Sequence, residues 1–115
     1  LLYAQPRELR VLYSWIRGIP MPPAWTGRKL KWLSEKPNAP VSGEMVGGNL
    51  CLLNDMIGTP FSANTDGKIV FLEDLGETAS RLDRMVHHLI QANFFKDVRA
   101  VVLGSFTDCG DKVPN

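Results

Sequence analysis

The chain has 115 residues, a net charge of +1, and 44% hydrophobic and 22% charged residues. This composition is typical of a folded globular domain and excludes a disordered segment. The lysines and arginines are scattered, which argues against a nucleic-acid partner. No apolar run approaches the roughly 18 residues that span a bilayer, and no leader segment is recognisable, so no membrane partner is expected. The two cysteines, Cys51 and Cys109, lack zinc-ligand spacing and are expected to be buried, reduced thiols.

Residues 1–40 are expected to hold a helix and a connector without an assigned role. Apolar residues share one broad face of Pro6–Arg17, which predicts a helix. The three prolines within residues 19–23 exclude a helix there and predict an extended connector. Leucine and tryptophan alternate with lysine over residues 27–33, which predicts a half-buried strand.

The next stretch predicts a strand, a glycine turn and a short helix. The strand is predicted over Val41–Val46 and the turn over Gly47–Asn49. A helix over Leu50–Ile57 would take Asn49 as its N-cap, because an asparagine side chain accepts a hydrogen bond from a free N–H of the first turn. Gly58 would follow as the left-handed residue that ends the helix.

Two further strands and one helix complete the predicted domain, residues 41–115. Ile69–Leu72 is a continuous apolar run, which predicts a strand buried on both faces. An amphipathic helix is predicted over Ser80–Ala92, where Ser80 and Asp83 have capping-box spacing. Ala100–Leu103 predicts another buried strand. Strands that alternate with short helices predict the α/β class.

An acidic cluster follows the apolar strand at Glu73, Asp74 and Glu77. Catalytic side chains gather at the carboxyl ends of strands in α/β proteins, because the loops there line the ligand crevice. A carboxylate in that place can orient a histidine, bind a divalent cation or act as an acid or base. Charged residues also follow strands without any function, so the pattern alone leaves these alternatives open.

The glycine turn at Gly47–Asn49 is a second candidate site. Glycine lets a backbone approach a ligand closely, and the helix that follows has unpaired N–H groups suited to an anion. No Lys-Ser or Lys-Thr pair follows, so the turn is not a P-loop. A tight structural turn is the alternative.

The remaining candidates are single residues. His87 and His88 are adjacent on the predicted helix, where their side chains point about 100° apart and do not readily share a metal ion. Ser105 follows a strand and is the best internal nucleophile, although it does not lie in a Gly-x-Ser-x-Gly motif. The sequence therefore predicts no metal site and no cofactor site.

Four ordered blocks resemble the serine LD-carboxypeptidase family of murein tetrapeptide carboxypeptidases and microcin C immunity peptidases. The blocks span about residues 43–109, and their order and spacing carry the resemblance. The family usually has a proline and a tyrosine before the third block, where this chain has Ala79-Ser80. The blocks are Gly47–Pro60, matched at Gly47–Leu50, Leu53 and Ile57–Pro60, then Gly67–Glu77, Arg81–Met85 and Val102–Phe106.

The resemblance implies a two-domain hydrolase, with a catalytic serine in a flavodoxin-like domain and a glutamate and histidine in a swivelling β/β/α domain. This chain resembles a fragment of the second domain. Glu73 matches the glutamate of the triad, whose carboxylate orients the histidine that deprotonates the serine. Asn49 and Gly48 are candidates for the substrate wall. The serine and histidine segments have no match in this chain, so it is expected to be inactive alone.

The implied substrate is a murein tetrapeptide, or a related peptide, whose L,D-bond is hydrolysed to release terminal D-alanine. The resemblance implies a cytoplasmic protein without a cofactor. A non-enzymatic binding or scaffold module of the same fold is the main alternative, and a metal-dependent hydrolase built on the acidic cluster is a weaker one. Apolar surface without a partner would favour self-association, so a homodimer is among the expected assemblies.

Overall fold

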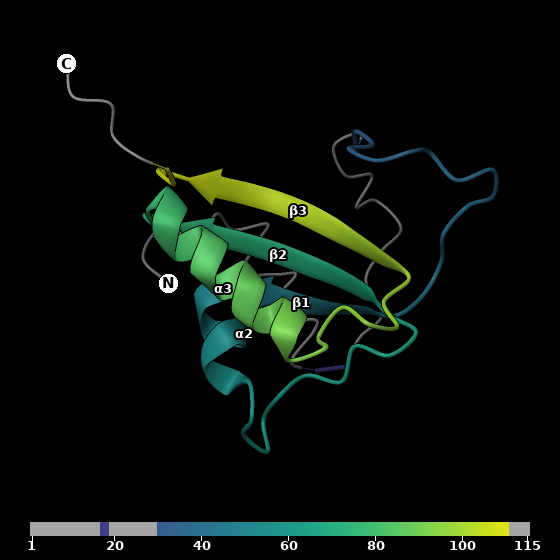
Figure 1. Ribbon diagram of the computed structural model, residues 1–115. Coiled ribbons are helices and arrows are strands. Elements are labelled where there is room, and N and C mark those ends of the chain that lie inside the picture. Colours follow the sequence, from purple (N-terminus) through teal and green to yellow (C-terminus); the bar gives the residue numbers. More distant parts are fainter. Residues whose placement is uncertain (1–16, 19–29, 111–115) are drawn as a thin grey trace. The chain divides into compact units, whose positions relative to one another are not determined.

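The computed structural model describes residues 17–18 and 30–110 of a chain that divides into two compact units, Leu1–Lys36 and Pro37–Asn115. The described part of the second unit alternates strands with helices (Figure 1), which confirms the predicted α/β class. Its elements are β1 (Met45–Asn49), α2 (Leu50–Met56), β2 (Ile69–Leu75), α3 (Ala79–Gln91) and β3 (Ala100–Thr107).

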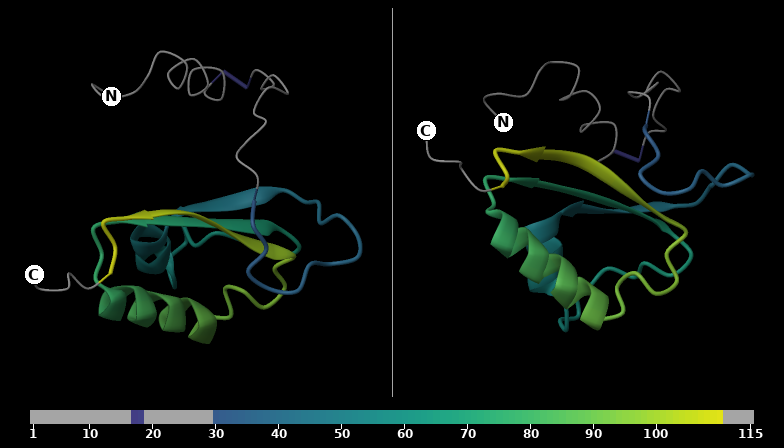
Figure 2. Two further views of the ribbon diagram at one scale, coloured as in Figure 1. Left: turned by 90° about the horizontal axis from the view of Figure 1, so that it is seen from above. Right: turned by 45° about the horizontal axis from the view of Figure 1, so that its top comes forward.

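The strands form one parallel sheet in the order β1-β2-β3. Both helices of this unit cover the same face of the sheet (Figures 1 and 2). This arrangement follows from two successive crossovers of the same hand, each of which places its helix on that face. Among the described residues of this unit, no helix covers the opposite face of the sheet.

The hydrophobic core lies between the sheet and the two helices. Three elements contribute buried apolar residues at the positions that their periods predict: two from α2, two from alternate positions of β2, and two from α3 one turn apart. No helix among the described residues is long and apolar enough to cross a membrane. The buried core consists of Leu50, Leu53, Val70, Leu72, Met85, Leu89 and Phe94.

The predicted turn at Gly47–Asn49 is wrong, because these residues form the second half of β1. Gly47 pairs with Phe71 of β2 and has a φ of +138°. A Cβ added to Gly47 would collide with the carbonyl oxygen of Phe71. Glycine therefore allows the two backbones to approach closely, and the strand begins later than predicted, at Met45.

The central strand β2 is longer than predicted and includes Glu73 and Asp74. Its side chains alternate between buried residues on the helix-covered face and half-buried residues on the other, so the prediction of two buried faces is wrong. The strand continues because Asp74 and Leu75 pair with Phe106 and Thr107 of β3.

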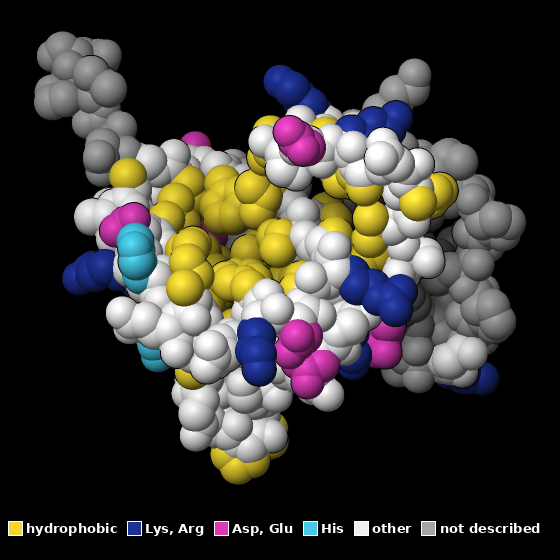
Figure 3. All heavy atoms as spheres, turned by 45° about the vertical axis from the view of Figure 1, so that its right-hand side comes forward, with side chains coloured by type: hydrophobic (Ala, Val, Ile, Leu, Met, Phe, Trp, Pro, Cys, Tyr) yellow, Lys and Arg dark blue, Asp and Glu magenta, His cyan; other side chains and the backbone are white. Residues whose placement is uncertain are grey.

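The outer strand β3 also differs from its prediction, because it runs four residues further than Leu103 and is not buried. Val101 and Leu103 are 46% and 47% exposed, although they pair with the buried Val70 and Leu72. The strand lies at the edge of the described sheet, where the helices leave its apolar side chains partly uncovered. Figure 3 shows apolar side chains gathered in a broad area on the face that it views. Self-association stays a prediction.

The start of α3 and the segment before β1 differ from their sequence predictions. Helix α3 begins after Thr78, whose side chain accepts a hydrogen bond from the backbone N–H of Arg81, so the predicted cap at Ser80 is wrong. The predicted strand over residues 27–33 is wrong where it is described, because Leu30 and Leu33 lie outside any strand and are 73% and 77% exposed. Alternation alone does not supply a partner strand. The predicted helix Pro6–Arg17, apart from Arg17, and the connector lie outside the described residues.

Candidate active site at the carboxyl end of the sheet

Two adjacent acids near the end of β2 face opposite sides of the sheet. Successive residues of a strand alternate between its faces, so Asp74 follows Val70 and Leu72 onto the helix-covered face and is 3% exposed. Glu73 is half-buried on the face that the helices leave open. The sequence presents these carboxylates as one cluster, but the strand separates them.

The carboxylate of Asp74 accepts three hydrogen bonds. Its Oδ1 accepts from Nδ2 of Asn49 at 3.0 Å and from the backbone N–H of Leu75 at 2.8 Å. Its Oδ2 accepts from the backbone N–H of Cys51 at 3.1 Å. A buried carboxylate requires such partners, and these three join the end of β1, the start of α2 and the end of β2. The role of Asp74 is therefore structural.

Asn49 is the predicted N-cap of α2, and the structure confirms that role. Its Oδ1 accepts from the backbone N–H of Leu52 at 3.1 Å, while its Nδ2 donates to Asp74. Both ends of the amide are thus engaged within the domain. Asn49 is also the register partner of Glu73 in the β1–β2 pair, so the structure brings two predicted site residues together. A substrate contact by Asn49 or Gly48 stays a prediction.

Glu73 lies beside an irregularity in the pairing of β2 with β3. Leu72 pairs with Leu103 but Asp74 pairs with Phe106, so Gly104 and Ser105 both lie opposite Glu73. A Cβ on Gly104 would lie 3.2 Å from Cβ of Glu73. The Glu73 carboxylate makes no hydrogen bond or ion pair with any residue in the described part of the chain. Glu73 is therefore the acid that remains available to a partner.

The third acid and the two histidines do not join this site. Oε2 of Glu77 forms an ion pair with Nε of Arg81 at 2.8 Å. Nδ1 of His87 lies 3.0 Å from the carbonyl oxygen of Asp83, and His88 bonds to α2; both histidines belong to α3 on the opposite face. Within residues 30–110, no three histidine, cysteine or acidic side chains are grouped to hold a metal ion, and the acidic cluster does not converge.

Comparison with known proteins supplies the family. Residues 42–115 match the LD-carboxypeptidase C-terminal domain. The murein tetrapeptide carboxypeptidase of Pseudomonas aeruginosa is 41% identical over 73 residues, which cover 63% of this chain and 24% of that protein. The crystal structure of muramoyltetrapeptide carboxypeptidase from Oxalobacter formigenes superposes with a TM-score of 0.65 at 31% identity, covering 97% of this chain and 36% of that one.

A more distant structure has the same fold. The microcin self-immunity protein MccF, solved in complex with aspartyl sulfamoyl adenosine, matches with a TM-score of 0.58 at 21% identity over 94% of this chain and 40% of its own. The chain spans 21% to 25% of the length of the first curated relatives that it matches. The matching domain covers residues 42–115, which is more than half of this chain. The chain therefore belongs to the LD-carboxypeptidase family.

Proposed function

We propose that this chain supplies Glu73 as the acidic member of a Ser-His-Glu triad in a cytoplasmic serine LD-carboxypeptidase. The reaction would hydrolyse the L,D-bond of a murein tetrapeptide and release terminal D-alanine. The separation of Glu73 from Asp74 carries the proposal, because it leaves one unpaired carboxylate at the carboxyl end of the central strand. The resemblance of Gly67–Glu77 to the family's acid-bearing block supports the same residue.

The geometry around Glu73 suits the orienting role of a triad acid. Such an acid accepts a hydrogen bond from one ring nitrogen of histidine, fixes its tautomer and stabilises the imidazolium that forms when the serine is deprotonated. That role requires a backbone that does not move and a carboxylate without another partner. β2 is paired on both sides, and the Glu73 carboxylate has no hydrogen-bond partner among the described residues.

The neighbouring strand offers room for a peptide. Gly48 precedes Asn49, the register partner of Glu73, and a Cβ added to Gly48 would meet nothing within 4 Å. A substrate backbone could therefore approach β1 here without a steric barrier. In this proposal Asn49 is a positioning residue, because its side chain holds the start of α2 and the Asp74 carboxylate in place.

A chimera tests the assignment of Glu73. Residues 42–110 of this chain would replace the matching segment of the Pseudomonas aeruginosa enzyme, and D-alanine release from murein tetrapeptide would be measured. Glu73→Gln should lower kcat by about 10⁴-fold, as expected for loss of a triad acid, without lowering the urea midpoint. The same change at the aligned glutamate of the intact enzyme gives a second arm. Turnover within a few-fold of the parent in both proteins would refute the assignment.

The 115-residue chain provides a complementary test. It should release no D-alanine from the tetrapeptide, because a carboxylate that orients a histidine cannot itself attack the peptide bond. Glu73→Gln in the same chain serves as the control for contaminating hydrolases. Release that depends on the chain and disappears in the Glu73→Gln chain would contradict the expected inactivity.

A further inference from the structure

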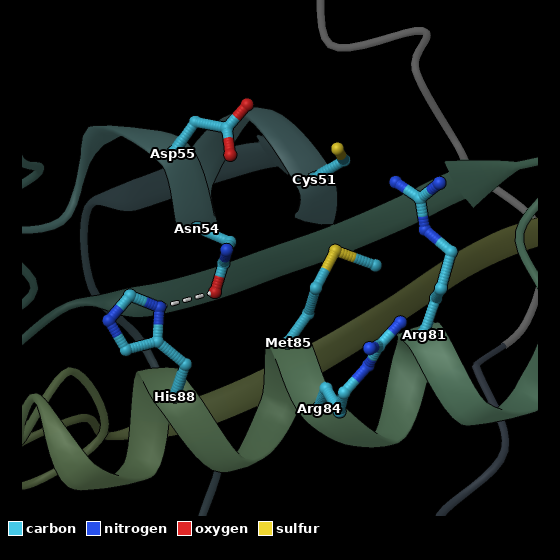
Figure 4. A pocket seen from close by; sticks show the side chains of 7 residues that line it. All are labelled: Cys51, Asn54, Asp55, Arg81, Arg84, Met85 and His88. Carbon is cyan, nitrogen blue, oxygen red and sulfur yellow. Dashed lines mark hydrogen bonds between the residues drawn. The ribbon is translucent and has the colours of Figure 1, made fainter.

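A cavity of about 380 Å³ lies between α2 and α3, on the helix-covered face of the sheet (Figure 4). The proposed reaction does not use it, since Glu73 faces the opposite side of the sheet. A volume of this size falls toward the small end of ligand pockets, which measure about 300–1,000 Å³. The residues that line it are Cys51, Asn54, Asp55, Arg81, Arg84, Met85 and His88.

Two arginines give the cavity its chemistry. Arg81 and Arg84 are three residues apart on α3, so they lie on neighbouring parts of one helix face. Figure 4 shows both arginine side chains on α3, with that of Arg81 extending away from the helix. Arg81 uses its Nε to bind Glu77, and neither of its terminal nitrogens has a partner among residues 30–110. Arg84 has no carboxylate within 4 Å in the described part of the chain.

The carboxylates at this cavity leave Arg84 without an ion pair among the described residues, since Glu77 pairs with Arg81. Asp55 projects from α2 on the other side, yet it forms no ion pair with Arg81 or Arg84. Arginine presents planar, forked donors that match phosphate oxygens in pairs, so Arg84 and the terminal nitrogens of Arg81 favour a phosphate group as the ligand.

The rest of the lining is suited to an organic group. The side chain of Met85 is 7% exposed and forms an apolar surface beside the arginines, and the half-buried Cys51 lies opposite on α2. His88 and Asn54 close one end, because Nδ1 of His88 lies 2.8 Å from Oδ1 of Asn54 (Figure 4). We infer that this cavity binds a small phosphomonoester, with the phosphate on Arg84 and the free nitrogens of Arg81 and the organic part against Met85.

Calorimetric titration of the full 115-residue chain with phenyl phosphate tests this site, with inorganic phosphate and benzoate as separate arms at matched ionic strength. We expect saturable binding of phenyl phosphate, and weaker binding of phosphate, which lacks the apolar group, and of benzoate, which has a single charge. Arg84→Gln should weaken phenyl phosphate binding by at least about tenfold, the loss of one charge-assisted hydrogen bond. Arg84→Lys keeps the charge and should give an intermediate loss.

Lys96→Gln is the matched control, because it removes the same charge from an exposed residue outside the cavity. It should change the affinity by less than about twofold, the range expected for a distant surface charge. A second readout places the ligand. Phenyl phosphate should slow alkylation of Cys51, which lines the cavity, and leave that of Cys109, which does not, unchanged.

Three results would overturn the inference. The first is the absence of saturable binding by phenyl phosphate, and the second is an equal loss of affinity in Arg84→Gln and Lys96→Gln, which would indicate general attraction to positive charge. The third is benzoate binding as tight as phenyl phosphate, which would assign a carboxylate site instead. Arg84 is exposed and makes no hydrogen bond among the described residues, so Arg84→Gln should fold normally and its unfolding midpoint verifies this. The outcome is independent of the Glu73 assignment.

Discussion

Asp74→Asn should destabilise the domain, whereas Glu73→Gln, at the adjacent acid, should lower catalysis and leave the stability almost unchanged. In Asp74→Asn the amide keeps the size of the side chain but offers a single acceptor oxygen. That oxygen would turn toward Asn49 and Leu75, which supply two donors, and leave the N–H of Cys51 facing an NH₂ group. The loss of one charge-assisted hydrogen bond beside a buried donor should destabilise the 115-residue chain by about 2 to 4 kcal/mol.

Urea unfolding followed by circular dichroism measures this difference. Glu73→Gln should change the free energy of unfolding by no more than about 0.5 kcal/mol, because the Glu73 carboxylate makes no hydrogen bond within the described residues. Equal destabilisation by the two variants, or none in Asp74→Asn, would refute the division into a structural acid and an available one.

Five further variants of the same chain, two matched pairs and one single change, test the packing of the domain. Gly47→Ala should lower the free energy of unfolding by more than roughly 3 kcal/mol, as expected for a strained backbone with a steric clash. Gly58→Ala should lower it by about 1 kcal/mol, because both glycines have positive φ but only Gly47 lies against backbone. Similar urea midpoints for the two variants would contradict this. Leu89→Ala should lower the free energy of unfolding by about 2 to 5 kcal/mol, because Leu89 is 0% exposed. Ile90→Ala should lower it by less than about 1 kcal/mol, because Ile90 is 55% exposed. An equal loss in the two variants would argue against the placement of α3. Thr78→Ala should lower the free energy of unfolding by about 1 kcal/mol, because the N-cap of α3 is lost. An unchanged urea midpoint would contradict the assignment of Thr78 as the cap.

The sequence predicted those elements whose local signals agree with their packing. The α2 cap at Asn49 and the left-handed Gly58 follow from rules that operate within a few residues, and both are confirmed. The apolar stripe of α3 also lies where its period requires, with Met85 and Leu89 in the core. These features depend on the chemistry of one segment and need no knowledge of its neighbours.

The errors concern contacts between segments. The glycines of β1 suggest a turn, but Gly47 is required because the backbone of Phe71 approaches it from the next strand. The apolar run of β2 was expected to end at Leu72, whereas pairing with β3 carries the strand through Asp74 and Leu75. The cavity between α2 and α3 was also missed; the spacing of Arg81 and Arg84 on one helix face was a signal that could have indicated it.

Gly104 offers a test of whether Glu73 depends on the irregular pairing with β3. In the chimera, a Cβ on residue 104 would lie 2.6 Å from Cζ of Phe71 and 3.2 Å from Cβ of Glu73, so the ring must move and the start of the Glu73 side chain must shift by a few tenths of an ångström. Gly104→Ala should therefore lower kcat by about 10²-fold, the effect of a misplaced catalytic group, with a loss of about 1 to 3 kcal/mol in stability.

A merely structural effect would persist when Glu73 is already absent. Adding Gly104→Ala to Glu73→Gln should therefore lower the residual D-alanine release by less than about twofold, because residues that act as a unit are not additive. Gly43→Ala is a matched control, since Gly43 also lacks a positive φ and its added Cβ would lie no closer than 3.4 Å to any atom beyond its two chain neighbours. If the double variant loses a further 10²-fold (about the full single-variant effect), Gly104 acts on the reaction by another route, and the packing of Phe71 does not position Glu73.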